Sequence, residues 1–151
     1  MLNRRTPTRH VLLAEDDEDD SILFKEALNE LSDEIQLNRV KDGEELMKFL
    51  NNRISDLPDV LFLDINMPRK NGFECLMEIK KAQQLSTLPV VVFSTSSGKE
   101  LVIKMYDAGA DLYVCKPNTF NRLKKIIQHA VSINWSSKVT QPNFENFILD
   151  I

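Results

Sequence analysis

LFLDINMPRKNG, residues 61–72, is the stretch that decides the fold. It begins inside the apolar run Val60–Leu63, which is short and continuous, as in strands that are buried on both faces of a parallel sheet. Asp64 follows this run directly, and two turn signals come next, Met67-Pro68 and Asn71-Gly72. The stretch therefore predicts a buried strand, a loop that begins with a carboxylate, and a helix that starts near Gly72.

The same order of elements repeats along the chain. Short apolar runs predict strands, and longer stretches with apolar residues at helical spacing predict helices. The expected strands are residues 11–14, 35–40, 60–63, 90–93 and 112–115, and the expected helices are 21–31, 43–52, 72–82, 97–107 and one that starts near 118 and runs on to 135. This alternation predicts an α/β fold, in which a doubly wound, five-stranded parallel sheet is covered by five helices as a three-layer sandwich.

Length and composition fit one domain with short ends. The 151 residues suffice for a substantial core but leave no room for a second domain of ordinary size. The hydrophobic share of 42% and the charged share of 28% are ordinary for a globular protein in water. We expect the domain at residues 10–135, between a short basic arm at 1–9 and a tail at 136–151. The tail ends in apolar residues, namely Phe144, Phe147, Ile148, Leu149 and Ile151.

Composition also argues against several classes of function. The net charge of -4 and the pI near 5.2 disfavour a nucleic-acid partner, because phosphate binding needs clustered lysine and arginine. No apolar run approaches the roughly 20 residues that cross a bilayer, and the polar start of the chain is no secretory signal. Cys75 and Cys115 lack CxxC spacing, so we expect buried free thiols. These features predict a cytoplasmic protein with no membrane partner.

Reactive side chains follow four of the five expected strands. They are Glu15-Asp16, Asp64, Ser94-Thr95 and Lys116-Pro117. Because the carboxyl ends of parallel strands meet at one edge of a sheet, we expect three carboxylates, two hydroxyls and an ammonium to lie together there. Carboxylates this close repel one another unless a cation neutralises them. Mg²⁺ is the cation that fits best, because it accepts two or three protein oxygens and bridges to a phosphoryl oxygen.

The acidic residues also have a simpler structural interpretation. Glu15–Asp20 is a run of six acids, and such runs are usually a solvated helix N-terminus, where the helix dipole favours negative charge. We accept that interpretation for Glu18–Asp20 and favour a functional role for Glu15 and Asp16, which follow a strand directly. Asp64 alone could be a helix cap or a turn residue.

The hydroxyls and the lysine have structural alternatives as well. Ser94 and Thr95 could cap the fourth helix, and this role is compatible with a functional one. Lys116 in isolation would be an ordinary surface lysine. The adjacent Pro117, which could be cis and fix a tight turn, favours a lysine that is aimed at the site.

Four motifs together resemble those of the response-regulator receiver family: LLAEDD (12–17), LFLDINMPRKNG (61–72), PVVVFSTS (89–96) and AGADLYVCKP (108–117). The resemblance covers roughly residues 11–135 and implies a flavodoxin-like sheet with strand order 2-1-3-4-5. It also implies a two-component response regulator, which accepts a phosphoryl group from a sensor histidine kinase or a phosphotransfer protein. Such a domain assists its own phosphorylation and dephosphorylation, changes conformation and signals through protein contacts, and it is not an enzyme for a separate substrate.

The resemblance assigns the acidic residues their roles. Asp64 would be the phosphorylation site, Glu15 and Asp16 would be the acidic pair that binds Mg²⁺, and Asn66 would offer its backbone carbonyl to the metal. Glu15 stands where aspartate is commoner in the family, which leaves the metal contact of this residue open.

The resemblance also assigns the switch. Ser94 and Lys116 would contact the phosphoryl group, and Ser94 keeps the hydroxyl of the threonine that is commoner at its position. The phosphoryl group would draw Ser94 inward, and Tyr113 would follow by a change of rotamer.

Four segments look like the subgroup of single-domain regulators that are paired with bacterial phytochrome-type kinases: DGEELMKFL (42–50), MPRKNG (67–72), FSTS (93–96) and INW (133–135). A receiver without an output domain must signal through its own surface. We expect a symmetric homodimer through the fourth helix, the fifth strand and the fifth helix, with the apolar tail covering the partner or a neighbouring groove. The alternative is that the tail folds back over its own domain.

Three other functions compete with this interpretation. A phosphatase or phosphotransferase of the haloacid dehalogenase class also uses a strand-end aspartate and Mg²⁺, but Asn66 stands two residues after Asp64, where that class needs its acid. A phosphorylation-independent interaction module is disfavoured by the intact set of acids, hydroxyl and lysine. A flavin-binding protein would need hydroxyls and backbone amides after the first strand, where this chain has acids.

Overall fold

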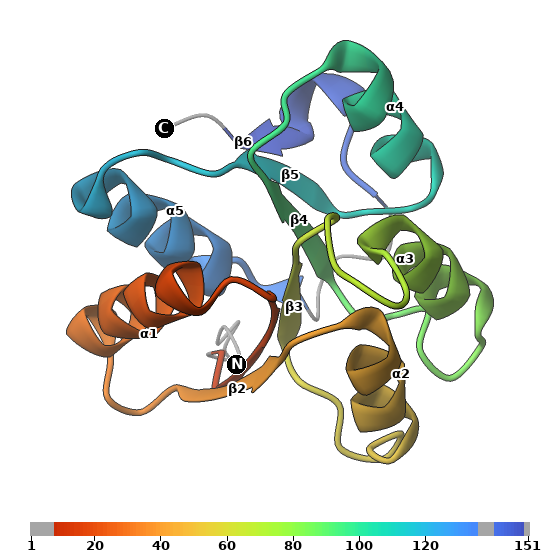
Figure 1. Ribbon diagram of the computed structural model, residues 1–151, viewed down its shortest axis with the longest axis horizontal. Coiled ribbons are helices and arrows are strands. Elements are labelled where there is room, and N and C mark those ends of the chain that lie inside the picture. Colours follow the sequence, from red (N-terminus) through yellow and green to blue (C-terminus); the bar gives the residue numbers. More distant parts are fainter. Residues whose placement is uncertain (1–7, 136–140, 150–151) are drawn as a thin grey trace, which may run out of the picture.

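A parallel sheet runs through the middle of the molecule in the computed structural model, which describes residues 8–135 and 141–149 (Figure 1). Its strands are β1 (His10–Ala14), β2 (Gln36–Val40), β3 (Val60–Leu63), β4 (Val90–Ser94), β5 (Leu112–Cys115) and β6 (Ile148–Leu149). They lie in the order β2-β1-β3-β4-β5-β6, and every neighbouring pair is parallel. The predicted order 2-1-3-4-5 is confirmed for the first five strands.

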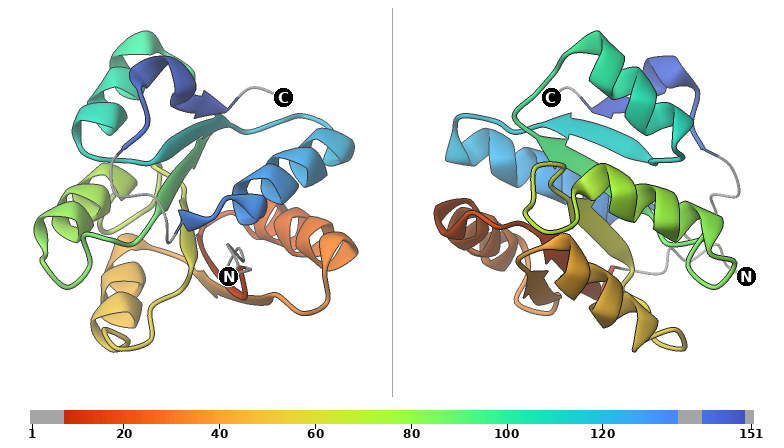
Figure 2. Two further views of the ribbon diagram at one scale, coloured as in Figure 1. Left: turned by 180° about the vertical axis from the view of Figure 1, so that it is seen from behind. Right: turned by 45° about the vertical axis from the view of Figure 1, so that its right-hand side comes forward.

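Helices cover both faces of the sheet, as Figures 1 and 2 show. They are α1 (Glu18–Leu31), α2 (Gly43–Asn51), α3 (Gly72–Lys81), α4 (Lys99–Asp107), α5 (Phe120–Ser132) and the short 3₁₀ helix η2 (Phe144–Asn146). Helices α1 and α5 lie on one face, and α2, α3 and α4 lie on the other. The predicted three-layer α/β sandwich is therefore confirmed.

Two hydrophobic cores fill the spaces between the layers. In β1, Leu12 and Ala14 belong to the core with α2, α3 and α4, whereas Val11 and Leu13 belong to the core with α1 and α5. The other central strands divide their side chains in the same alternating way. Both faces of these strands are thus buried, which is why each one appears in the sequence as an unbroken apolar run.

Polar side chains begin most of the helices close to the carboxyl ends of the strands. Asp17 caps α1 by accepting from the Asp20 N–H, and Asp42 caps α2 in the same way. Asn71 and Glu74 form a capping box at the start of α3. Helix α4 differs, because its N-cap is Gly98 and no side chain caps it. The structural alternative, in which Ser94 and Thr95 cap the fourth helix, is therefore not adopted.

Two features of the C-terminal part differ from the prediction: β6 was not predicted, and α5 ends earlier than predicted. Strand β6 extends the predicted five-stranded sheet at the β5 edge, and its two residues are too few to show any periodicity. Helix α5 was expected to reach Trp135 but ends at Ser132, because Ile133 takes an extended conformation. The indole N–H of Trp135 instead folds back and donates to the Ala130 carbonyl.

Other corrections concern single residues after β5. Cys115 is exposed, contrary to prediction, because it is the last strand residue and lies at the rim of the sheet, whereas Cys75 is buried as expected. The peptide bond between Lys116 and Pro117 is trans, so the cis alternative is not adopted.

The ends of the chain are described only in part. Residues 1–7, which make up most of the basic arm, and residues 136–140 and 150–151 of the tail lie outside the described residues. The described part of the tail, residues 141–149, packs on its own domain beside α4 and β5, as both views in Figure 2 show. Across residues 8–135 and 141–149, no helix is long and apolar enough to cross a membrane.

Candidate functional site

Asp64 lies at the centre of the carboxyl edge of the sheet. Its backbone N–H donates to the Ala14 carbonyl, which fixes the end of β3 against β1. Its side chain is almost fully buried, and one carboxylate oxygen accepts the Asn66 N–H at 3.1 Å. The start of α3 lies directly against this turn, since a Cβ on Gly72 would come within 2.5 Å of the Asp64 carbonyl oxygen. Only glycine fits there, and this close approach holds Asp64 in place.

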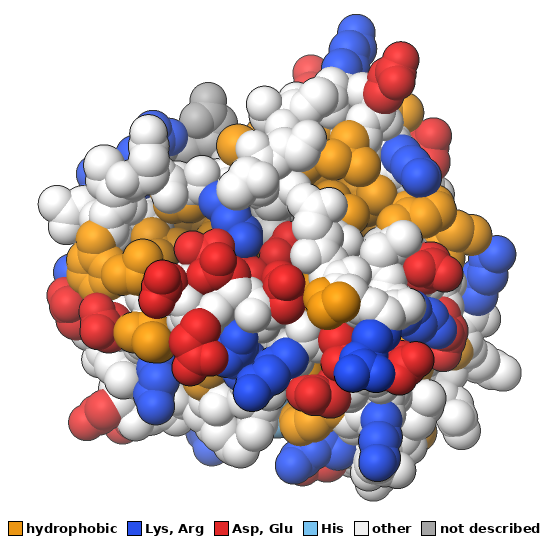
Figure 3. Space-filling view, viewed as in Figure 1, with side chains coloured by type: hydrophobic (Ala, Val, Ile, Leu, Met, Phe, Trp, Pro, Cys, Tyr) orange, Lys and Arg blue, Asp and Glu red, His pale blue; other side chains and the backbone are white. Residues whose placement is uncertain are grey.

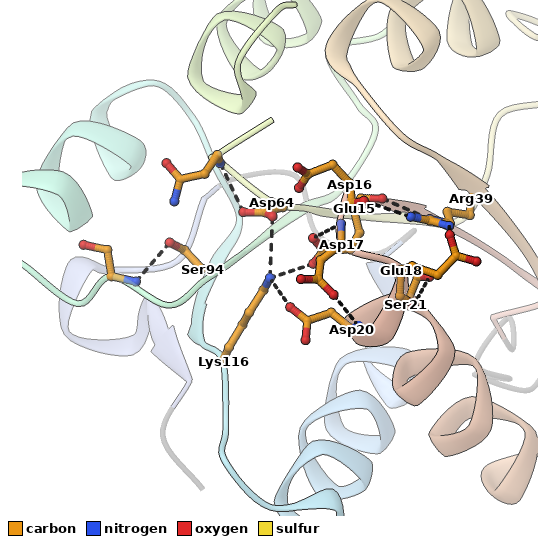
Figure 4. Close-up of polar contacts among 12 residues, drawn as sticks. Glu15, Asp16, Asp17, Glu18, Asp20, Ser21, Arg39, Asp64, Ser94 and Lys116 are labelled. Atoms are coloured by element: carbon orange, nitrogen blue, oxygen red, sulfur yellow. Dashed lines mark hydrogen bonds and ion pairs between the residues drawn. The ribbon is translucent and has the colours of Figure 1, made fainter. Parts of the chain in front are cut away.

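Glu15 and Asp16 come to the same place from the end of β1. The Glu15 N–H donates to the Val40 carbonyl of β2, and the Glu15 side chain is buried, whereas Asp16 is exposed. Carboxylate oxygens of Glu15, Asp16 and Asp64 lie within 4.8 Å of one another. The predicted cluster of three carboxylates is therefore present, and Figure 4 shows their side chains turned toward one another.

Lys116 enters the cluster from the end of β5. Its backbone N–H donates to the Ser94 carbonyl, and its ammonium lies 2.6 Å from Glu15 Oε1, 3.0 Å from Asp20 Oδ2 and 3.5 Å from Asp64 Oδ2 (Figure 4). The ammonium also lies 5.5 Å from the centroid of the Phe93 ring. The structure thus places Lys116 in the site, and the surface-lysine alternative is wrong.

The charges of the site alter the proton affinity of its groups. Burial and the neighbouring Asp64 carboxylate raise the pKa of Glu15 to about 7, although Lys116 acts in the opposite direction. Burial alone would lower the pKa of Lys116, but its hydrogen bonds to Glu15 and Asp20 and the charge of Asp64 together hold that pKa above its ordinary value.

One ammonium does not balance the cluster. Glu15, Asp16, Asp20 and Asp64 supply four carboxylates around Lys116, and acidic side chains gather on this face of the molecule (Figure 3). Burial is the first cause of the raised pKa of Glu15, and the nearby Asp64 carboxylate adds to it. The donor set is all oxygen and suits a hard divalent cation.

Ser94 ends β4 beside the cluster. It is fully buried, and its hydroxyl oxygen accepts the Ser96 N–H at 3.1 Å. The adjacent Thr95 is exposed. Tyr113 of β5 is buried, its hydroxyl donates to the Ser96 carbonyl, and burial raises the pKa of its phenol. Ser94 and Tyr113 therefore both contact Ser96, in the loop that leads to α4.

The remaining predicted residues lie at the rim of the site. Asn66 is exposed and lines, with Asp16 and Met67, an open cavity of about 470 Å³ between the loop after β3 and α4. Pro117 is partly buried just beyond Lys116.

Asp20 and Arg39 belong to the site but were not predicted. Asp20 lies in the first turn of α1 and pairs with Lys116, whereas we had assigned it to a solvated helix start. Arg39 of β2 donates to the carbonyls of Glu15 and Asp16 and fixes the backbone of the acidic pair. Nothing in the sequence distinguishes Asp20 from the other acids of its run, because Asp16 lies before α1 and helical spacing does not relate the two. Arg39 gave no signal either, since it precedes the end of its strand.

The comparisons with known proteins agree with this geometry. A family model described as the response regulator receiver domain matches residues 11–128. Response regulator Rcp1 of Synechocystis sp. is 34% identical over 146 residues, which cover 94% of this chain and 99% of the relative.

Solved structures extend the likeness to three dimensions. The Mn²⁺-bound form of response regulator Rcp1 is similar at a TM-score of 0.75 with 34% identity, over 89% of this chain and 99% of the other. The phosphorylated cyanobacterial phytochrome response regulator RcpA is similar at a TM-score of 0.76 with 32% identity, over 90% and 99% of the two chains. The bacteriophytochrome response regulator AtBRR gives a TM-score of 0.68 with 31% identity, over 82% and 94%.

Proposed function

Since the chain belongs to the response regulator receiver domain family, we propose that Asp64 accepts a phosphoryl group from a sensor histidine kinase or a phosphotransfer protein. The observation that supports this most directly is the meeting of Lys116 with the carboxylates around Asp64. The relative RcpA has been solved in a phosphorylated form. In the transfer, the bond between the donor nitrogen and phosphorus breaks as a bond from an Asp64 oxygen to phosphorus forms.

Glu15, Asp16 and Asp64, with the backbone carbonyl of Asn66, would hold Mg²⁺. The oxygen donor set and its uncompensated charge favour this ion, and the relative Rcp1 has been solved with Mn²⁺. When bound, Mg²⁺ neutralises part of the charge on the phosphoryl oxygens. Arg39 keeps the backbone of Glu15 and Asp16 in place for this role.

Lys116 and Ser94 then act on the phosphoryl group. The Lys116 ammonium, now shared among carboxylates, would pair with a phosphoryl oxygen. The Ser94 hydroxyl would leave the Ser96 N–H and donate to another phosphoryl oxygen, and the loop at Ser96 would move with it. Tyr113 also binds Ser96, so this movement would reach the Tyr113 ring on β5. The chain assists its own phosphorylation and dephosphorylation and does not act on a separate substrate.

Labelling with a small phosphodonor tests the proposal. With radiolabelled acetyl phosphate, we expect an acid-stable, base-labile label on the full chain in Mg²⁺ and none in excess EDTA. Asp64→Asn should abolish the label and keep the fold, whereas the matched control Asp56→Asn, at an exposed position, should label normally. Undiminished labelling in EDTA, or of Asp64→Asn, would refute the proposal. Phosphotransfer from each sensor kinase of the source organism would then identify the donor.

We also propose a homodimer on the side of α4, α5 and the tail. The tail exposes apolar side chains there, namely Phe144 and Ile148. Strand β6 pairs with β5, so the interface would use the outer side of β6 in place of the expected β5 edge. Light scattering on the full chain and on a chain ending at residue 135 tests this. A full chain that stays monomeric at high concentration, with and without a phosphoryl analogue, excludes the dimer.

A further inference from the structure

The C-terminal segment, residues 141–149, is built into the domain beside Tyr113. Strand β6 pairs in parallel with β5, with Ile148 opposite Tyr113, and the Tyr113 N–H donates to the Phe147 carbonyl at 3.0 Å. The Phe147 side chain is 0% exposed and belongs to the same hydrophobic core as Tyr113. This segment lies beyond residues 11–128, which the family model matches, so its role has to be inferred from its own contacts.

Hydrogen bonds to α4 fix the start of the segment. The Gln141 amide donates to the carbonyls of Tyr106 and Ala110, and the Tyr106 hydroxyl donates to the Pro142 carbonyl at 2.7 Å. The Phe147 ring lies 5.0 Å from the Tyr106 ring between centroids. The segment is therefore anchored at both ends, and Phe147 lies between the anchors.

A continuous line of contacts joins Phe147 to the phosphoacceptor site. The Phe147 and Tyr113 rings lie 6.2 Å apart between centroids, and Tyr113 is 1% exposed beneath this cover. The Tyr113 hydroxyl donates to the Ser96 carbonyl, and the Ser96 N–H donates to the Ser94 hydroxyl oxygen. Tyr113 thus already occupies an inward position while the Ser94 hydroxyl is still held by Ser96. In this position the Tyr113 ring packs against Phe147 on one side, and its hydroxyl is held by Ser96.

We propose that Phe147 is a positioning residue of the switch, which holds Tyr113 inward and thereby couples docking of the C-terminal segment to phosphorylation of Asp64. The inference rests on the proposed function. If the phosphoryl group and the docked segment both favour the inward position of Tyr113, each strengthens the binding of the other, and the factor is the same in both directions. The segment then acts as a built-in ligand of the α4–β5 surface.

Affinity for a phosphoryl analogue tests the coupling. Beryllium trifluoride is titrated into the full chain at saturating Mg²⁺. We expect Phe147→Ala to weaken its binding by about fivefold or more, the lower range of typical allosteric coupling, and Phe147→Leu to restore most of the affinity. Phe144→Ala is the matched control, because Phe144 is an exposed aromatic residue of the same segment that contacts Tyr106 and Phe147. This control should change the affinity less than twofold.

A double-mutant cycle separates positioning from mere packing. In a Tyr113→Ala background, Phe147→Ala should have no further effect on the affinity, because the residue through which Phe147 acts is gone. Conversely, the analogue should slow amide hydrogen exchange at residues 147–149 of the unmutated chain by the same factor. Equal affinities of the full chain and Phe147→Ala, or an undiminished effect of Phe147→Ala without Tyr113, would overturn the inference, whatever the change in melting temperature.

Two controls keep the inference apart from the proposed function. If the full chain is not labelled at Asp64 by acetyl phosphate, the proposed function fails, whereas normal labelling with no effect of Phe147→Ala refutes the coupling alone. The affinities should not depend on protein concentration, because the segment docks on its own chain. A loss that appears only at high concentration would assign the docking to a second copy and overturn the intramolecular coupling.

Discussion

Two largely buried lysines lie at opposite ends of the same sheet, and their surroundings differ. Lys80, in the last turn of α3, donates to the carbonyls of Leu88 and Ser86 and pairs with Asp111 at 3.0 Å, at the amino ends of β4 and β5. Asp111 also accepts the Val90 N–H. One ammonium here meets one carboxylate, and backbone groups complete the hydrogen bonds of both.

Lys116, at the carboxyl ends of the strands, meets several carboxylates at once. It contacts Glu15, Asp20 and Asp64, and Asp16 lies within the same cluster. The described cluster thus places four carboxylates near one ammonium, and burial together with the Asp64 carboxylate raises the pKa of Glu15. In the pair Lys80–Asp111 the two charges are equal and opposite, and the pair links α3 to the sheet. In the cluster around Lys116 the carboxylates outnumber the ammonium, which lowers stability but leaves the site able to bind a cation and a phosphoryl group.

The largest expected effect on stability comes from removing the ion pair between Lys80 and Asp111. Lys80→Met should lower the free energy of unfolding by roughly 2–3 kcal/mol, because the Asp111 carboxylate stays largely buried without its cation. Urea unfolding measures this, and Lys81→Met, at an exposed position, is the matched control with an effect below about 0.5 kcal/mol. Labelling of Asp64, counted per folded molecule, should not change. A variant as stable as the control would show that the pair does not fasten α3 to the sheet.

Loss of Lys116 should lower the free energy of unfolding by less than loss of Lys80, and Mg²⁺ should reverse the effect. Without Mg²⁺ at pH 8, Lys116→Met should destabilise by about 1–2 kcal/mol, since Glu15 can take up a proton and the site is open to solvent cations. Millimolar Mg²⁺ should restore this loss, because the carboxylates that bind the ion remain, and should restore none of the loss in Lys80→Met. Unfolding of both variants with and without Mg²⁺ makes the comparison. If Mg²⁺ restored the stability of both variants equally, the two lysines would not differ in the way proposed.

The sequence predicted the carboxyl end of the sheet well because its signal is local. Each central strand is an apolar run, and the residue that follows it, such as Asp64 or Lys116, must lie at that edge once the sheet is parallel. The role of Asp20 was not predicted, because a run of acids has the same sequence whether it is solvated or contacts a distant residue. Its partner, Lys116, lies 96 residues away in the chain.

The C-terminal segment could not be predicted because tertiary contacts determine it. Ile148 and Leu149 form a strand of two residues, which pairs with β5 next to Phe147, whose side chain lies in the same core as Tyr113. The end of α5 is a similar case: the apolar residues up to Trp135 continue the helical pattern, but Trp135 gains a hydrogen bond to Ala130 by leaving the helix. Local propensity is a weak guide where packing offers such alternatives.

A smaller effect is the dependence of Mg²⁺ binding on pH at the carboxyl end of the sheet. Because the pKa of Glu15 is raised to about 7, most Glu15 side chains are protonated at pH 6 and must release the proton when a cation binds. Apparent Mg²⁺ affinity should therefore fall by about tenfold from pH 8 to pH 6. Calorimetric titration measures this, and Glu15→Gln, though weaker in affinity, should lose most of the dependence. An unmutated chain with the same affinity at both pH values would contradict the assignment of the proton to Glu15.

The smallest effect concerns an ion pair whose arginine is exposed, and it can be compared with the pairs of the two largely buried lysines. Arg69 pairs with Asp42 at 3.4 Å, but its side chain is 66% exposed, and such pairs contribute about 0–1 kcal/mol. Its backbone has φ of 69°, in the left-handed region that glycine adopts without the usual cost. Arg69→Gly should therefore raise the free energy of unfolding by up to about 1 kcal/mol despite loss of the pair.

Arg69→Ala is the matched control. It loses the pair and keeps the backbone cost, so it should lower that free energy slightly, by no more than about 0.5 kcal/mol. Urea unfolding of the three proteins decides the order. A glycine variant less stable than the unmutated protein would mean that the pair contributes more than the backbone strain, and one less stable than the alanine variant would mean that glycine relieves no backbone strain at this position.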